Sequence, residues 1–264
     1  MAEDIELATE EGGAASLSAV ESVQFFKITT LSGTGSAYLN GLKRGDVIVA
    51  IDGRVNRHNL SDLLTGIRVR KEQETLVTYI RNGVLFSVFV TGYLGLDAEI
   101  ATPDAIEEYK EIIDREGLIG KSGCRPYSVY INRENKCEIR DNTPSILALV
   151  FPPFWMLSQR YVEGMIGCIM VYTVCAIINF WLFVLVYCAF SYSVWREQKK
   201  FVDMFLLRMG YRPYMRLAGY SEEYLQLALL KDRVELDFMY PSPEAQDYKE
   251  KNMPKDPNQK DYLL

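Results

Sequence analysis

The side chains that most often carry out catalysis are sparse in this sequence. His58 is the only histidine, so a Ser-His-Asp triad would have a single possible base. The sequence contains neither a His-Glu-x-x-His zinc motif nor the Gly-x-Ser-x-Gly turn of hydrolases. The stretch GTGSA, Gly33 to Ala37, lacks the lysine and the spacing of a phosphate loop. A Ser-Lys dyad has no pattern of its own to search for, and nothing suggests one. We therefore predict a protein that is not an enzyme and that needs no cofactor or metal.

Charge and cysteine usage narrow the class further. The net charge is −6, which argues against a nucleic-acid partner, because phosphate backbones require a basic face. No Cys-x-x-Cys occurs, so a zinc site of the usual spacing is not expected. Cys168, Cys175 and Cys188 lie in an apolar run and should pack as small hydrophobes. Cys124 and Cys137 could pair in an exported protein, but we expect free thiols in a reducing compartment.

The elements that could hold a ligand are strands and helices between residues 18 and 100. Apolar, β-branched runs predict strands at 23–31 and 46–51, the second closed by the turn pair Asp52-Gly53. A helix is expected from Asn59, with Asn59 or Ser61 as its cap. Asn82-Gly83 lies between two apolar runs, which predicts a hairpin.

This order of elements resembles a PDZ domain, specifically the bacterial type found in HtrA-like proteases and related envelope proteins. The pattern that carries the resemblance is A-x-x-x-G-L-x-x-G-D-x-I-x-x-I-D-G. The matching residues are Ala37, Gly41, Leu42, Gly45, Asp46, Ile48, Ile51 and Gly53, followed by Arg81. The resemblance covers about a third of the chain and implies a partly open β-barrel with two helices.

The resemblance also implies where a peptide would bind. PDZ ligands add a strand to a sheet edge beside a helix, which places the receiving strand at Phe25 to Thr30. The carboxylate-binding loop then falls on residues 22–25, where Gln24 replaces the usual glycine and puts carboxylate binding in doubt. The stretch YLGL, Tyr93 to Leu96, looks more like such a loop, but it follows the last expected strand and would extend the sheet.

The expected peptide-binding groove consists of Val23, Gln24, Phe25, Phe26, Lys27, Ile28, His58, Leu60, Leu64 and Ile67. In some PDZ domains a histidine near the position of His58 reads a ligand hydroxyl. The alternative is an exposed loop histidine without a role. The groove itself could also be filled by another protein or by this chain.

An apolar run predicts a membrane domain. Gly164 to Trp195 holds 32 residues without Asp, Glu, Lys, Arg or His, which is roughly 48 Å of helix against a hydrocarbon core of about 30 Å. Asn179 could mark a turn between two halves. Arg196 and Lys199 follow the run, and Arg160 precedes it, which favours a hairpin with both ends in the cytoplasm. The alternative is one tilted helix with the PDZ-like domain outside.

An interfacial helix is expected before this run, because aromatic side chains favour the headgroup zone. The expected membrane-interface residues are Phe151, Phe154, Trp155, Arg160 and Tyr161. The segment also resembles a widespread bacterial membrane domain of unknown function, with the match carried by Pro153, Trp155, Arg160 and Tyr161.

The whole chain is therefore expected to be an α+β protein with a PDZ-like partly open β-barrel, two helices and an α-helical membrane hairpin. The expected segments are a disordered acidic N-terminus (1–17), the PDZ-like domain (18–100), a connector with an amphipathic helix and a small hairpin (101–143), the membrane domain (144–210), a cytoplasmic helix (211–240) and a disordered tail (241–264).

The expected function is that of a non-catalytic, membrane-anchored adaptor or scaffold at the bacterial inner membrane, with its PDZ-like domain in the cytoplasm. Its partners would be proteins, themselves membrane proteins, and the lipid bilayer. One alternative is an accessory structural subunit of a larger membrane complex. Another is a subunit that presents substrates to a membrane protease.

Overall fold

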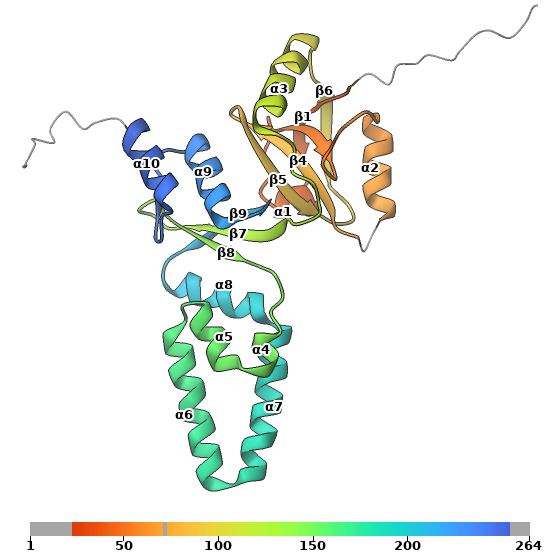
Figure 1. Ribbon diagram of the computed structural model, residues 1–264. Helices are drawn as coiled ribbons and strands as arrows, with labels where there is room; N and C mark the ends of the chain where they lie inside the picture. The colour runs from red at the N-terminus through yellow and green to blue at the C-terminus, as the bar shows by residue number, and fades with distance from the viewer. Residues whose placement is uncertain (1–22, 71–72, 254–264) are drawn as a thin grey trace, which may run out of the picture.

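The computed structural model describes residues 23–70 and 73–253 (Figure 1). Over these residues the chain is a mixed α/β protein with one ten-stranded sheet. Its strands are β1 (Phe26–Leu31), β2 (Val47–Ile51), β3 (Arg54–Val55), β4 (Thr75–Arg81), β5 (Val84–Val90), β6 (Leu96–Ile100), β7 (Arg125–Ile131), β8 (Lys136–Asp141), β9 (Arg212–Gly219) and β10 (Asp237–Phe238). Its helices are α1 (Ser36–Leu39), α2 (Leu60–Val69), α3 (Pro103–Glu116), α4 (Leu147–Val150), α5 (Pro152–Ser158), α6 (Val162–Ile178), α7 (Phe180–Arg196), α8 (Gln198–Arg208), α9 (Glu222–Asp232) and α10 (Pro243–Asn252).

The sheet joins two halves of the chain. Its order is β10-β8-β7-β9-β5-β4-β2-β1-β6, with β3 paired to β2 outside this path. All neighbours are antiparallel except β10 and β8, which are parallel. The halves meet where β5 pairs with β9, in the register Ser87 to Ala218. The N-terminal half therefore ends at β6, and β6 is one edge of the whole sheet.

Several local predictions for the N-terminal half are confirmed. Asn82 and Gly83 have φ angles of 50° and 75°, which the two-residue turn between β4 and β5 requires. Asn59 caps α2 by accepting a hydrogen bond from the Asp62 N–H at 2.8 Å, as N-cap side chains do. Asp46, one of the residues that carry the PDZ resemblance, accepts the Lys43 N–H at 2.7 Å and closes the turn before β2.

Helices cover both faces of this half. On one face α2 buries Leu63 and Ile67 in a core that also takes Leu225 and Leu229 from α9. On the other face α3 packs Ile112 and Ile113 against apolar side chains of the sheet, among them Phe25. Each Å² of apolar surface buried in these two layers stabilises the fold by about 25 cal/mol.

The C-terminal half differs from its expected organisation. The small hairpin expected near residues 127–141 is present as β7 and β8, with Asn135 at φ 60° in its turn. The segment expected as one helix, 211–240, instead begins with β9, which inserts between β7 and β5. The tail expected to be disordered from residue 241 contains α10, capped by Ser242.

The expected α+β barrel with a membrane hairpin is wrong, because the N-terminal strands are part of a larger sheet and the spanning helices are not found. The apolar run is divided at Asn179, whose backbone is extended (φ −165°, ψ 130°) and whose side chain accepts the Trp181 N–H at 2.8 Å. The helices on either side, α6 and α7, have 17 residues each, or about 25 Å. Within residues 23–70 and 73–253, no helix combines the length and apolarity needed to cross a membrane. The inner-membrane location was inferred from such a span and loses its basis.

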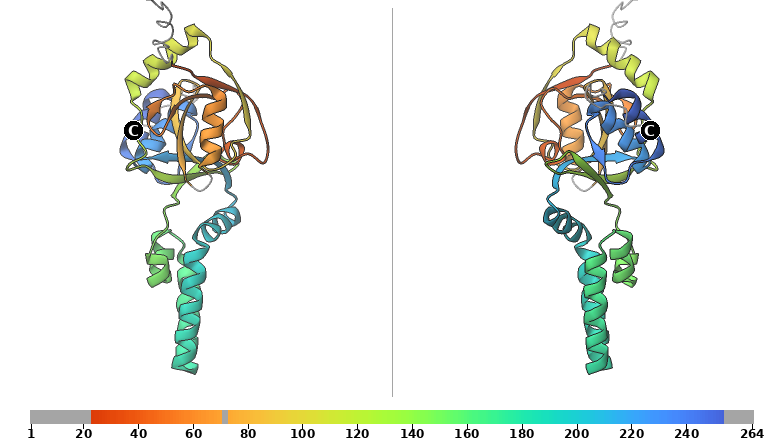
Figure 2. Two further views of the ribbon diagram at one scale, coloured as in Figure 1. Left: turned by 90° about the vertical axis from the view of Figure 1, so that its right-hand side faces the viewer. Right: turned by 90° about the vertical axis from the view of Figure 1, so that its left-hand side faces the viewer.

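The two helices nevertheless form a hairpin that stands out from the rest of the protein. Figures 1 and 2 show α6 and α7 side by side, extending away from the sheet, with α4, α5 and α8 around their base. Tyr172 of α6 contacts the aromatic rings of Phe183, Tyr187 and Phe190 on α7. These ring contacts hold the two helices together along the hairpin.

Candidate functional site

The strand expected to receive a peptide has no open edge. β1 pairs with β2 on one side, in the register Phe26 to Ile48, and with β6 on the other, in the register Phe26 to Ile100. Phe25, Phe26 and Ile28 are buried in the core, whereas the Lys27 side chain points to solvent. From Phe26 to Ile28 this chain's own backbone therefore occupies both edges of β1, and the expected groove along Phe25 to Thr30 stays a prediction.

The loop before β1 forms hydrogen bonds with Asn56. The Gln24 N–H donates to the Asn56 carbonyl at 3.1 Å, and the Gln24 carbonyl accepts from Asn56 Nδ2 at 2.9 Å. Val23 is half-buried beside them, and Ser22 lies outside the described residues. The Gln24 N–H is therefore used by Asn56 and is not available to a carboxylate.

The open edge lies on β6 instead. The Ala101 N–H donates to the Phe25 carbonyl at 2.9 Å, and the Gly95 carbonyl accepts the Ser32 N–H at 2.7 Å. Successive residues of a strand face opposite sides of the ladder, so the backbone groups of Ala98 and Ile100 face outward. Within the described part of the chain β6 pairs with β1 alone. An extended peptide could add there as a further strand.

The loop that leads into β6 carries two glycines in the left-handed region. Gly92 and Gly95 have φ angles of 65° and 67°, conformations that glycine adopts without strain. The carbonyls of Tyr93 and Leu94 accept N–H groups of α1 at 2.9 and 3.1 Å and so point into the protein. Neither the Leu94 nor the Gly95 N–H donates a hydrogen bond to any group in the described residues. Adjacent N–H groups without a partner can bind an anion where they converge.

Helix α2 supplies apolar side chains to the same core. Leu60 and Leu64 are half-buried and Ile67 is buried, all packed with the cluster that contains Leu94 and Leu96. These three α2 residues, expected to line a groove, thus lie in one core cluster with Phe26 and Ile28 of β1 and with Leu94 and Leu96.

His58 lies elsewhere, on the rim of a cavity of about 620 Å³ between α2 and the β2–β3 hairpin. Its N–H and carbonyl are bound to the Asn56 side chain at 3.3 and 3.0 Å. The cavity wall also carries Asp52, Asp62 and Arg70. The structure therefore does not bring His58 together with the open edge of β6.

The residues expected at a membrane interface divide into exposed and internal groups. Phe151 and Phe154 are exposed, with ring centroids 6.1 Å apart. Trp155 is buried at the base of the hairpin. Tyr161 is half-buried, and its ring centroid lies 4.5 Å from that of Phe205.

Arg160 joins this base to the sheet and to the C-terminal segment. Its Nη1 lies 3.4 Å from Glu138 Oε1, and its guanidinium carbon lies 3.5 Å from the centre of the Tyr240 ring. Glu138 also pairs with the buried Arg140 at 2.9 Å. Desolvation by burial raises the pKa of the Glu138 carboxyl, although both arginines act to lower it. Arg160 therefore has a structural role at this joint.

The hairpin beyond this base exposes apolar side chains on many sides. Trp181, at its tip, is 76% exposed, and Ile177 is 80% exposed. The other exposed large apolar side chains of α6 and α7 are Val162, Ile166, Ile169, Met170, Val171, Val174, Ile178, Phe180, Leu182, Leu185, Tyr192 and Trp195. Large groups of exposed apolar side chains on one surface mark interaction sites.

Within the described ranges, no group of three or more His, Cys, Asp or Glu side chains could hold a metal ion. The described cysteines are free thiols, and Cys137 is buried, which raises the pKa of its thiol. A reactive cysteine needs a lowered pKa, so this thiol is a core residue.

No model of a known protein family matches the chain, and no curated protein matches it. The functional argument therefore depends on the geometry of the chain itself.

Proposed function

We propose that this protein is a non-catalytic adaptor that binds the C-terminal end of a partner polypeptide at the outer edge of β6. The observation that carries the proposal is the combination of an unpaired strand edge with two free N–H groups at its start. The order of elements, which resembles a PDZ domain, supports peptide binding as the function, although the resemblance places the peptide at Phe25 to Thr30 rather than at β6.

The loop and the edge together fix the direction of the bound peptide. The terminal carboxylate would accept the N–H groups of Leu94 and Gly95, which precede β6. The peptide would then run antiparallel to β6 and exchange backbone hydrogen bonds with Ala98 and Ile100. Leu94 and Leu96 are buried, so the large apolar side chains exposed along this loop and strand are those of Tyr93 and Ile100, which favours a partner with apolar side chains.

Peptide-binding measurements test this proposal. Peptides selected from a library with random C-terminal residues and free carboxylates should bind, as followed by fluorescence anisotropy. The same peptides as C-terminal amides should bind at least about tenfold more weakly, because hydrogen bonds to a charged group contribute roughly 1.5–3 kcal/mol. Equal binding of acid and amide would contradict carboxylate capture.

A matched pair of β6 variants locates the peptide. Ala98→Pro removes one outward N–H without touching the bonds to β1, and proline is tolerated on an edge strand. Loss of one hydrogen bond of about 0.5–1.5 kcal/mol predicts weaker peptide binding. Ala98→Ser keeps the N–H and should bind as the unchanged protein does. If both variants bind the peptide as tightly as the unchanged protein does, the peptide does not bind along β6.

The exposed hairpin favours a second candidate function, that of an accessory structural subunit of a larger complex. Apolar side chains on α6 and α7 would then be covered by a partner protein in fixed stoichiometry. Native co-purification should retain that partner in Ala98→Pro and lose it in the double variant Ile177→Lys/Trp181→Lys. If the isolated protein instead floats with phosphatidylcholine vesicles, lipid covers the apolar side chains of the hairpin, and the subunit hypothesis is contradicted.

A further inference from the structure

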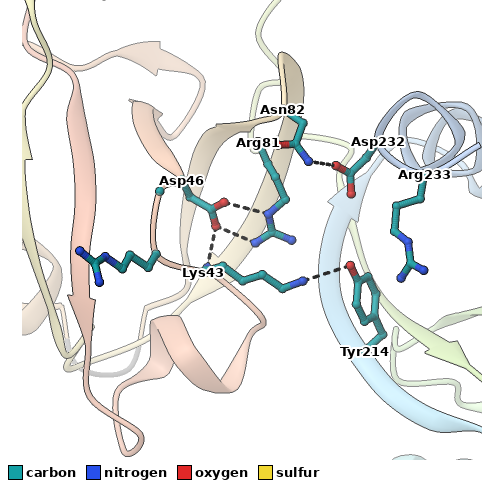
Figure 3. Close-up of a pocket in the computed structure, with 9 residues that line it drawn as sticks. Lys43, Asp46, Arg81, Asn82, Tyr214, Asp232 and Arg233 are labelled. Atoms are coloured by element: carbon teal, nitrogen blue, oxygen red, sulfur yellow. Dashed lines mark hydrogen bonds and ion pairs between the residues drawn. The ribbon is translucent and has the colours of Figure 1, made fainter.

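A cavity of about 440 Å³ lies where the two halves of the sheet meet (Figure 3). From the N-terminal half it is lined by the turn before β2 and the end of β4, and from the C-terminal half by β9 and the end of α9. The lining residues are Lys43, Arg44, Gly45, Asp46, Arg81, Asn82, Tyr214, Asp232 and Arg233. The cavity is partly open to solvent, and polar and cationic groups dominate its lining.

Arg81 enters the cavity from β4 with one nitrogen unused. Its side chain is 7% exposed, Nε donates to Asp46 Oδ1 at 2.8 Å, and Nη2 donates to Asp46 Oδ2 at 2.6 Å and to the Gly41 carbonyl at 2.9 Å. Nη1 is buried and has no hydrogen-bond partner in the described chain. Figure 3 shows this nitrogen turned away from Asp46, towards Tyr214. A buried donor without an acceptor is unfavourable, so an acceptor entering the cavity from this side would be stabilised.

Two further cations and a hydroxyl face the same space. Lys43 Nζ lies 3.2 Å from the Tyr214 hydroxyl, and it lies 4.8 Å from the centre of that ring. Arg233 approaches the ring from the other side, with its guanidinium carbon at 5.8 Å. Lys43 from the N-terminal half and Arg233 from the C-terminal half thus both lie close to the ring of Tyr214.

The carboxylates of the cavity are already engaged. Asp46 is bound by Arg81, and Asp232 accepts the Asn82 amide at 2.7 Å. Arg233 also contacts the exposed Glu235 at 2.5 Å. Neither Lys43 nor Arg44 forms an ion pair within the described residues. Cationic groups therefore outnumber carboxylates around the cavity.

We propose that this cavity binds a phosphate group, either free or as a small phosphomonoester. A phosphate dianion matches the excess of positive charge and accepts several hydrogen bonds at once, which arginine and lysine side chains supply. The free nitrogen of Arg81, the ammonium of Lys43, the guanidinium of Arg233 and the Tyr214 hydroxyl are the donors. Arg44 adds positive charge at the rim.

Binding at this place would join the two halves of the sheet. The two halves meet where β5 pairs with β9, with Ser87 opposite Ala218. Lys43 and Arg81 come from the N-terminal half, and Tyr214 and Arg233 come from the C-terminal half. A ligand that contacts both halves stabilises their arrangement, because it binds the joined form alone. Phosphate is therefore expected to raise the melting temperature as well as to bind.

Isothermal titration with inorganic phosphate, at constant ionic strength in chloride, tests the site. Lys43→Met and Arg233→Gln each remove one charged donor and should weaken phosphate binding about tenfold, the usual effect of losing a charge-assisted hydrogen bond. Arg68→Gln changes an exposed arginine of α2 outside the cavity and should leave the affinity within about twofold. Lys43 is exposed and Arg233 is half-buried, and circular dichroism checks that each variant folds.

A second titration, with O-phosphoserine, distinguishes the sources of the phosphate group. Tighter binding than that of inorganic phosphate supports a phosphomonoester, and equal or weaker binding supports free phosphate. The inference is overturned if inorganic phosphate and O-phosphoserine both fail to bind, or if Lys43→Met and Arg233→Gln bind them as the unchanged protein does.

Discussion

Gly35 and Gly95 touch backbone to backbone: a Cβ added to Gly95 would lie 2.6 Å from the Gly35 Cα. A Cβ on Gly35 would in turn lie 2.2 Å from the Leu94 carbonyl oxygen. The turn before α1 and the loop before β6 are thus held together by the absence of side chains at these two positions. This contact sets the orientation of the loop whose free N–H groups carry the proposed function.

Gly35→Ala should therefore displace the β6 loop. Forcing a methyl group into a packed contact typically destabilises a protein by about 1–3 kcal/mol, and peptide affinity should fall with it. Urea unfolding and anisotropy measure the two effects. Gly33→Ala is the matched control, because a Cβ at Gly33 meets nothing within 4 Å. Equal stability and binding of the two variants would show that the contact does not position the loop.

The buried pair of Asp46 and Arg81 should contribute strongly to stability. Asp46→Asn leaves the Arg81 charge, 7% exposed, without its carboxylate, and breaking a buried pair from one side typically costs about 3–5 kcal/mol. Replacing both partners, as Asp46→Leu with Arg81→Met, should recover much of that loss. A double-mutant cycle in urea measures the coupling. Additive losses would mean that the two side chains act independently.

Glu138 should make stability depend on pH. Desolvation raises the pKa of its carboxyl in the folded protein, against the opposing charges of Arg140 and Arg160 and with support from Glu222. The folded state therefore binds the proton more tightly than the unfolded state, and stability falls as the pH rises from the unfolded pKa through the folded pKa.

Comparison with Glu138→Gln isolates this contribution. The free energy of unfolding of the unchanged protein should decline relative to that of Glu138→Gln from about pH 4.5 upwards, since the unperturbed glutamate pKa is about 4.3. Chemical unfolding at a series of pH values measures the difference. If the unchanged protein instead gained stability relative to Glu138→Gln as the pH rises, the two arginines would outweigh desolvation at Glu138.

The hairpin should govern self-association or partner binding rather than folding of the sheet. Ile177→Lys with Trp181→Lys places two charges on side chains that are 80% and 76% exposed. Binding of a hydrophobic dye and light scattering should both decrease, whereas the free energy of unfolding in urea should stay within about 0.5 kcal/mol of that of the unchanged protein. Glu223→Lys, on the exposed side of α9, is the control for added positive charge. A large loss of stability in the double variant would mean that the hairpin is part of the folding core.

Local patterns predicted much of the N-terminal half but not its strand order. The Asn82-Gly83 turn and the Asn59 cap depend on neighbouring residues, and both are present as expected. Whether a strand lies inside a sheet or at its edge depends on its partners, which periodicity does not reveal. The strand expected at 23–31 was therefore given an open edge at Phe25 to Thr30, whereas the structure pairs β1 with both β2 and β6. The one glycine of YLGL, Gly95, was the sequence signal for the loop that leads into the edge strand β6.

The C-terminal half was harder to predict for the same reason. β9 contains Pro213 and two arginines, so its sequence lacks the alternation of a typical strand. It forms because β7 and β5 accept it on either side. The division of the apolar run at Asn179 was anticipated as a turn, but the resulting helices are shorter than the membrane hairpin required.

Nuclear magnetic resonance with a bound peptide tests the central claim most directly. Adding a peptide with a free carboxylate to the isotope-labelled protein should shift the amide signals of Leu94, Gly95, Ala98 and Ile100 most strongly, and the C-terminal amide of the same peptide should lose the shifts at Leu94 and Gly95. The account is contradicted if the largest shifts fall on β1, on the hairpin or on the cavity at Arg81, with the signals of β6 unchanged.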